Sequence, residues 1–143
     1  MLVRSMVAAA ALLGAVSPGW SGVVQSPVSV TADVADLGPT YAIGNTIDQS
    51  GLSPGFVSGA TDFDSYVAGV PRHGNLSADI WLSAASANAA TVTFDLGALY
   101  WLETFALWNR DPPGQGVENF SLRFSKQPDF ATSSQVAGLT AAE

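Results

Sequence analysis

The sequence of 143 residues contains no cysteine, one histidine and only five lysine or arginine residues. Without cysteine it can form no disulfide, no zinc–thiolate site and no cysteine nucleophile. Twelve acidic residues against five basic ones give a net charge of −7, and no basic stripe is available to neutralise phosphates. We therefore expect no nucleic-acid partner, and anionic membrane surfaces are disfavoured. Neutral ligands and cations suit this composition better.

The sequence lacks two kinds of motif that common enzyme classes use. It has no phosphate-binding glycine loop and no cluster of His, Asp and Glu at metal-ligand spacing. The single histidine, His73, lies in the loop sequence Pro-Arg-His-Gly-Asn. Asp62 and Asp64 form an acid pair in a polar loop, where such pairs are usually solvated. We expect no enzymatic activity.

An apolar segment stands at the N-terminus. Arg4 precedes an unbroken apolar run over residues 6–16 (MVAAAALLGAV), which Ser-Pro-Gly then ends. This order is typical of a secretory signal peptide, and the run is shorter than the ~20 residues that span a membrane. A buried N-terminal helix is the alternative. We expect residues 1–26 to be removed at a site between 19 and 26, leaving residues 27–143 secreted or at the cell surface, without a membrane span.

The rest of the chain has the composition and pattern of one all-β domain. The whole sequence is 48% hydrophobic and 12% charged, which favours a folded core. Apolar residues alternate along several short runs that Gly, Pro, Asn and Asp separate, as in a sandwich or jelly roll. The strands are expected at residues 25–34, 79–83, 91–96, 101–109 and 117–124. Residues 37–69 are expected to form loops, with one helical turn near 41–47.

The alternation predicts which side chains form the core. Apolar residues occupy every second position of the later strands, so one face of each is expected to be buried. The predicted core residues are Phe94, Leu96, Phe105, Leu107, Phe120 and Leu122. Asp95 lies between two of them and is expected to point outward or to cap the turn at Gly97.

Four segments carry a resemblance to a known family. Residues 92–97 (VTFDLG) are similar to a strand ending in Asp-Leu-Gly, and residues 102–110 (LETFALWNR) and 120–129 (FSLRFSKQPD) are similar to the two strands that follow it. Residues 42–48 (AIGNTID) resemble an Ala-x-Asp-Gly loop, with Gln49 in place of the usual Gly. The set resembles the discoidin family, also called the coagulation factor 5/8 C-terminal domain, of the galactose-binding-like superfamily.

The resemblance spans residues 28–137 and implies a galactose-binding-like jelly-roll β-sandwich. The family has further strands after the last matching segment, so we expect the sandwich to be incomplete, with C-terminal strands missing. After Phe130 the chain supplies one short strand, at 135–139. An open sheet exposes unpaired backbone groups. The chain alone is therefore expected to be marginally stable or prone to aggregate, and native downstream sequence is expected to rescue it.

The resemblance also implies ligand-binding loops at one end of the sandwich. The candidate carbohydrate-binding residues are Arg72, His73, Asn75, Trp108, Asn109 and Arg110. Fucose-binding relatives use a histidine with an Arg-x-Asp motif, whereas here Arg110 is followed directly by Asp111. Arg110 has the alternative role of pairing with an acid at the end of a strand. The candidate stacking platforms are Trp81, Trp101 and Trp108, with packing in the core or rim as their alternative.

A structural calcium ion is the one cofactor that the resemblance suggests. Asp48 matches a loop aspartate that ligates calcium in carbohydrate-binding members, and Ser53 loosely matches the Thr/Ser ligand that follows. Calcium takes carboxylate and carbonyl oxygens from irregular loops of this kind. A solvated loop without an ion is the alternative.

Together these observations predict an extracellular, non-catalytic binding module. Its expected partner is a glycan, recognised through loops at one end of the sandwich. An adhesion or matrix module that binds an extracellular protein through the same loops is the first alternative. The accessory domain of a larger secreted hydrolase is the second.

Overall fold

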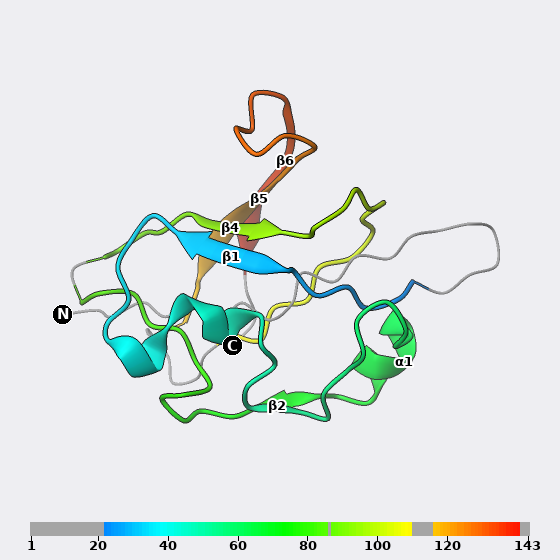
Figure 1. The fold of residues 1–143 in the computed structure, drawn as a ribbon, viewed down its shortest axis with the longest axis horizontal. Coiled ribbons are helices and arrows are strands. Elements are labelled where there is room, and N and C mark those ends of the chain that lie inside the picture. The colour runs from blue at the N-terminus through cyan, green and yellow to red at the C-terminus, as the bar shows by residue number, and fades with distance from the viewer. Residues whose placement is uncertain (1–21, 86, 110–115, 141–143) are drawn as a thin grey trace.

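The computed structural model describes residues 22–85, 87–109 and 116–140, which fold mainly into short strands joined by long loops (Figure 1). The strands are β1 (Ser29–Ala32), β2 (Leu52–Ser53), β3 (Arg72–His73), β4 (Val92–Asp95), β5 (Asn119–Ser125) and β6 (Ser133–Thr140). The helices are α1 (Phe63–Ala68) and the short 3₁₀ helices η1 (Pro39–Tyr41) and η2 (Ile43–Thr46). The prediction of a mainly β fold is confirmed, as is the helical turn near residues 41–47.

The strands form three antiparallel pairs, β1–β4, β2–β3 and β5–β6, that share no strand. The described residues therefore do not show the two facing sheets of a jelly roll. Two strand predictions are wrong, those at 79–83 and 101–109. In the first segment the carbonyls of Ile80 and Leu82 accept hydrogen bonds from the Asn45 side chain and the Leu37 N–H, at 3.0 and 2.8 Å. Residues of neighbouring loops thus form the hydrogen bonds to this backbone that an adjacent strand would otherwise form.

Side chains reinforce both ends of the β1–β4 pair. The N–H of Thr91 donates to the Asp33 carboxylate at 2.7 Å, and the N–H of Asp33 donates to the Thr91 carbonyl at 3.1 Å. Hydrogen bonding from Thr91 also lowers the pKa of the Asp33 carboxyl below its usual value. At the other end Asp95 accepts from the Gly97 N–H at 2.8 Å, and Gly97 has φ +76°. This confirms the predicted role of Asp95 as a turn cap.

One helix anchors the first of two buried clusters. Asp62 caps α1 by accepting from the Ser65 N–H at 2.8 Å, and Gly69 ends it. Phe63 and Tyr66 lie three residues apart, hence on one face, and both are buried. The Tyr66 hydroxyl donates to a backbone carbonyl at 2.7 Å, and burial raises its pKa. The sequence did not predict this helix, because six residues are too few to establish a helical period.

The buried core lies in the loop-rich part of the chain that precedes β4. The first cluster consists of Val24, Phe56, Phe63 and Tyr66. The second consists of Ile80 and Leu82, beside the buried Trp81. The six predicted core residues, by contrast, are only half-buried. The predicted alternation is observed along β5, where Ser121 and Arg123 are exposed between half-buried neighbours. It is not observed along β4, where Thr93 is as half-buried as Phe94. No second layer of the described residues covers the apolar faces of these strands.

Residues 22–26 belong to the folded domain. Val23 forms a β-bridge with Asp62, the Gly22 carbonyl accepts from the Phe63 N–H at 2.8 Å, and Val24 has no exposed surface. The sequence analysis assigned this stretch to the signal peptide, whose other residues lie outside the described part of the chain. Residues 22–26 are therefore part of the fold that the structure describes.

Alanine substitutions should distinguish the observed core from the predicted one. We expect Phe63→Ala to lower the free energy of unfolding by about 3–5 kcal/mol, because its ring is packed on all sides. Phe94→Ala should cost less than about 2 kcal/mol, because its ring is half-buried. Val67→Ala, on the exposed face of α1, is the control. Urea denaturation measures the loss of unfolding free energy in each of the three variants. A larger loss for Phe94→Ala than for Phe63→Ala would contradict this description of the core.

Candidate functional site

Trp108 brings together two segments that the sequence predicted to share a ligand. Its indole Nε1–H donates to the Pro71 carbonyl at 2.9 Å, directly before Arg72 and His73 of β3. The half-buried ring packs against both core clusters and meets the Tyr66 ring edge-on, at 6.4 Å between centroids. Trp108 is therefore an anchor beneath this edge of the domain rather than an open stacking platform.

The two residues of β3 present polar groups at that edge. In the pairing with β2, Arg72 lies opposite Ser53 and His73 lies opposite Leu52. Arg72 is exposed, and among the described residues its guanidinium has no hydrogen-bond or ion-pair partner. Five N–H donors are therefore available to a ligand. Asn75, two residues further on, is exposed and already takes part in a polar contact.

His73 is oriented by its own loop. Its Nδ1 lies 2.7 Å from the Gly74 carbonyl oxygen. A carbonyl can only accept, so we assign the ring proton to Nδ1, which leaves Nε2 as an acceptor in the neutral ring. The side chain is half-buried. It therefore offers an acceptor next to the Arg72 donors, a combination that suits hydroxyl groups.

Two glycines and one aspartate fix the path of the loop around β3. Gly74 donates its N–H to the Gly51 carbonyl at 2.7 Å, and Gly51 has φ +75°. The Asp79 carboxylate fills the space beside both: a Cβ on Gly51 would lie 2.7 Å from the Asp79 Cβ, and one on Gly74 would lie 2.6 Å from Oδ2. Gly51 therefore requires glycine both for space and for its backbone angle. A Cβ on Gly74 would push the end of the Asp79 side chain aside.

Two ligand candidates remain: Asn109 has a structural role, and Arg110 lies outside the described residues. Asn109 uses both ends of its amide on one residue: its Nδ2 donates to the Val117 carbonyl at 2.9 Å, and its Oδ1 accepts from the Val117 N–H at 2.7 Å. The amide thus joins the two ends of the segment between them. Arg110 lies outside the described residues, so the predicted proximity of His73 and Arg110 stays a prediction.

Only one of the three candidate stacking tryptophans is open to solvent. Trp81 is buried and donates from Nε1 to the Asp36 carboxylate at 2.7 Å. Trp108 is the anchor described above. Trp101 is 76% exposed, in a loop where Leu99 and Tyr100 are also exposed. Packing, the alternative role, therefore applies to the first two.

The candidate calcium ligands have local roles in the β2 region. One Asp48 oxygen accepts from the Ser50 N–H at 2.8 Å, which closes a turn, and Ser53 lies in β2 opposite Arg72. Calcium needs six to eight oxygens. Across residues 22–85, 87–109 and 116–140, no three His, Asp or Glu side chains gather to hold a metal ion. A calcium site stays a prediction that rests on two side chains.

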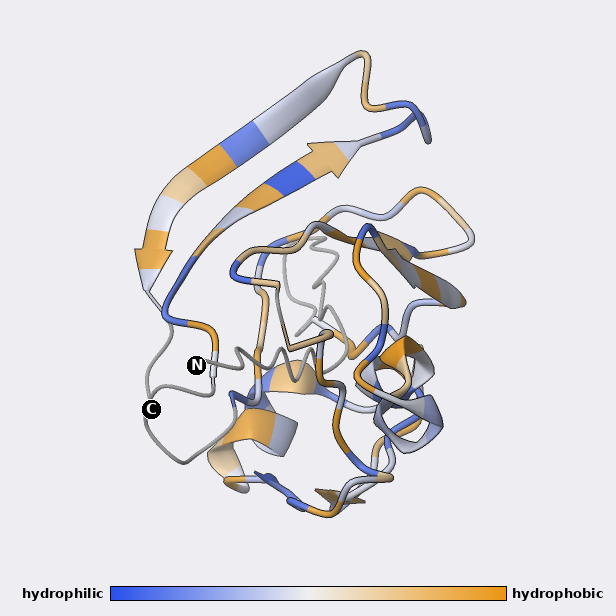
Figure 2. Cartoon of the chain, turned by 90° about the vertical axis from the view of Figure 1, so that its left-hand side faces the viewer, coloured by the Kyte–Doolittle hydropathy of each residue, from blue (hydrophilic) through white to orange (hydrophobic). Residues whose placement is uncertain are grey.

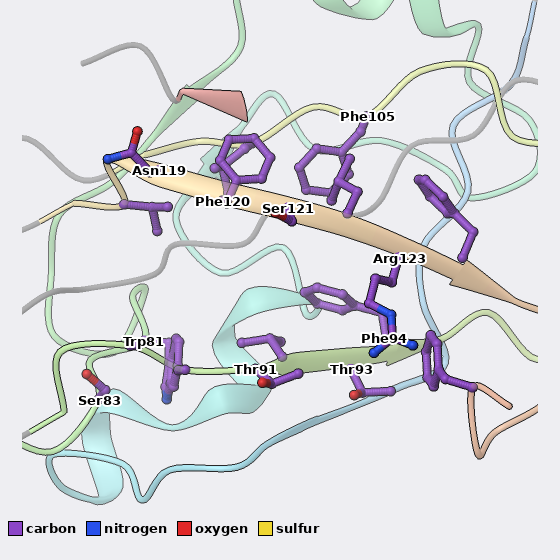
Figure 3. Close-up of a pocket in the computed structure, with 18 of the residues that line it drawn as sticks. Trp81, Ser83, Thr91, Thr93, Phe94, Phe105, Asn119, Phe120, Ser121 and Arg123 are labelled. Carbon is purple, nitrogen blue, oxygen red and sulfur yellow. The ribbon is translucent and has the colours of Figure 1, made fainter. Parts of the chain in front are cut away.

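An open cleft lies between β4 and β5 and was not predicted from the sequence. It has a volume of about 720 Å³, and its walls carry the half-buried faces of both strands (Figure 3). Apolar side chains dominate these walls, among them Phe94, Phe105, Phe120, Leu122 and Phe124. The β5–β6 hairpin stands away from the rest of the chain, with apolar and polar bands alternating along it (Figure 2). The residues predicted to form a closed core thus line an open cleft.

The close approach of Asp79 to Gly74 can be tested directly. We expect Gly74→Ala to lower the melting temperature, because its new Cβ would overlap the carboxylate, whereas Gly44→Ala, with nothing within 4 Å, should be nearly neutral. Combining Gly74→Ala with Asp79→Ala should recover much of the loss, since the second change removes the overlapping atoms. Thermal denaturation of these variants, of Asp79→Ala alone and of the unchanged chain measures this. Strictly additive losses for Gly74→Ala and Asp79→Ala would contradict the proposed overlap.

Comparison with known proteins adds no relative to this description. No family model, no curated protein and no solved structure matches the chain. Within the described residues, no helix has the length and apolar character needed to cross a membrane.

Proposed function

We propose that this chain is an extracellular, non-catalytic binding module that recognises neutral carbohydrate at the β3 edge. The observation that carries the proposal is the hydrogen bond from Trp108 to the Pro71 carbonyl, which places the segment containing Trp108 against Arg72 and His73. Sequence reasoning selected these residues from separate parts of the chain. A galactose-binding-like sandwich and a secreted location remain part of this proposal.

The chemistry of the edge suits sugar hydroxyls. Each hydroxyl both donates and accepts, and the edge offers the exposed Arg72 donors beside the free Nε2 acceptor of His73. An uncharged ligand also suits a chain with a net charge of −7. The histidine Nδ1 is held by a backbone carbonyl rather than a carboxylate, so this ring lacks the partner that typically orients a catalytic base.

A second candidate function, recognition of an extracellular protein, is favoured by the cleft between β4 and β5. Apolar aromatic walls of this size suit side chains of a protein partner better than sugar hydroxyls. Both functions are compatible with an accessory domain of a larger secreted hydrolase. They use different surfaces, so variants of one surface leave the other intact.

Binding to a glycan array tests the leading function. We expect the chain to bind neutral glycans, and Arg72→Ala and His73→Ala each to weaken that binding by about tenfold or more, because each removes hydrogen bonds to the ligand. Lys126→Ala, which removes an exposed cation elsewhere, is the matched control and should bind as the unchanged chain does. No binding to any neutral glycan, or equal binding by all four proteins, would refute the assignment.

A further inference from the structure

One edge of β4 has backbone groups without a partner. The carbonyls of Thr91 and Asp95 accept from β1-side residues Asp33 and Val28, at 3.1 and 2.8 Å. Backbone groups alternate in direction along an antiparallel strand, so the N–H and C=O of the intervening Val92 and Phe94 point to the other edge. In the described part of the chain β4 pairs with β1 alone. An unpaired edge of this kind accepts an additional strand.

The unpaired edge belongs to a wall of the apolar cleft. Residues 91–94 line the cleft on one side, residues 117–124 line it on the other, and no residue of β1 takes part (Figure 3). A small apolar molecule would cover the aromatic side chains but leave the backbone groups of β4 without hydrogen bonds. A β-strand with apolar side chains satisfies both requirements.

Charge along the cleft restricts the occupant further. Glu118 directly precedes β5 and Asp129 follows it, and both are exposed residues of the cleft lining. Arg123 is the one basic residue among the described residues of the lining, and it is already engaged. Its guanidinium lies 5.6 Å from the centre of the Phe130 ring and donates to the Ser133 hydroxyl at 3.1 Å. Glu118 already takes part in an interaction of its own. Both ends of the cleft carry an exposed carboxylate, which complements a cation.

From this geometry and charge we infer that the cleft receives one extended β-strand of a partner polypeptide, apolar at alternate positions and basic at both ends. The strand pairs with Val92 and Phe94, directs its apolar side chains at Phe105 and Phe120, and places its basic ends near the two carboxylates. A strand of about five residues, some 17 Å long, provides the pairing. This surface is separate from the β3 edge, so the inference does not depend on carbohydrate recognition.

Hydrogen exchange on the full chain tests the inference, with a synthetic peptide of about seven residues as the probe. The peptide carries lysine at each end and alternates valine with threonine between them. We expect saturating peptide to slow exchange of the Val92 and Phe94 amides by about tenfold or more, because they gain hydrogen bonds. The Thr93 amide, on the edge already paired with β1, should change little.

Two controls separate pairing and charge from simple apolar contact. A peptide N-methylated along its pairing edge should bind at least about tenfold more weakly, since it cannot donate to β4. The double variant Glu118→Gln, Asp129→Asn should bind the lysine-ended peptide about threefold or more weakly than the unchanged chain at low salt. This difference in affinity should fade in high salt. Both substitutions are at exposed positions, and thermal denaturation checks that they leave the fold intact.

The same experiment has clear contrary outcomes. Absence of peptide binding would overturn the inference. So would protection that falls on β5 or β6 rather than on Val92 and Phe94, because the added strand would then pair with an outer edge of the β5–β6 hairpin. Equal affinity of the N-methylated peptide would show that the cleft takes apolar groups without strand pairing. None of these outcomes affects glycan binding at Arg72 and His73, so failure here is distinct from failure of the proposed function.

Discussion

The packing of Trp108 is the constraint on which the rest of the domain depends. The three strand pairs share no strand, so no continuous sheet connects them. Trp108 contacts the cluster around Phe63 and Tyr66, the cluster of Ile80 and Leu82, and the backbone at Pro71. One side chain thus joins parts of the molecule that β-pairing leaves separate. Its hydrogen bond also satisfies the indole N–H, which makes burial of a large polar-tipped ring favourable.

Trp108 also helps to hold the proposed ligand-binding edge at β3 in a fixed position. A two-residue strand such as β3 is too short to be held by its pairing with β2 alone. Trp108 holds the chain just before it, and the contact of Gly51 and Gly74 with Asp79 holds the chain just after it. Arg72 and His73 are therefore presented from a short segment with fixed ends. Such preorganisation lowers the entropy lost when a ligand binds.

Local features were predictable from the sequence. Alternation of apolar and polar residues located β1, β4 and β5, and the Asp95–Gly97 turn followed from the preference of glycine for positive φ. The location of the core was not predictable, because alternation shows which face of a strand is apolar but not whether another layer covers it. Phe94 and Phe120 illustrate this, since both lie on apolar faces that line an open cleft.

The candidate site was predictable only in part, because its residues lie far apart in the sequence. The resemblance grouped Arg72 and His73 with Trp108, and the structure brings them together. It gave no sign that the Asn109 amide bonds the Val117 backbone, because the two residues lie eight positions apart and no local pattern pairs them. The cleft could not be predicted either, because the strands that line it have the same apolar alternation as strands of a buried core.

The central claim is that Trp108 joins the two buried clusters into one cooperative unit. Native-state hydrogen exchange tests it most directly, because two amides report on the two clusters: Phe63, which donates to Gly22, and Leu37, which donates to Leu82. The account predicts that both amides and the Trp108 indole N–H exchange with one common opening free energy. Exchange of the Leu37 amide through a separate, lower-energy opening, with the Phe63 amide still protected, would contradict it.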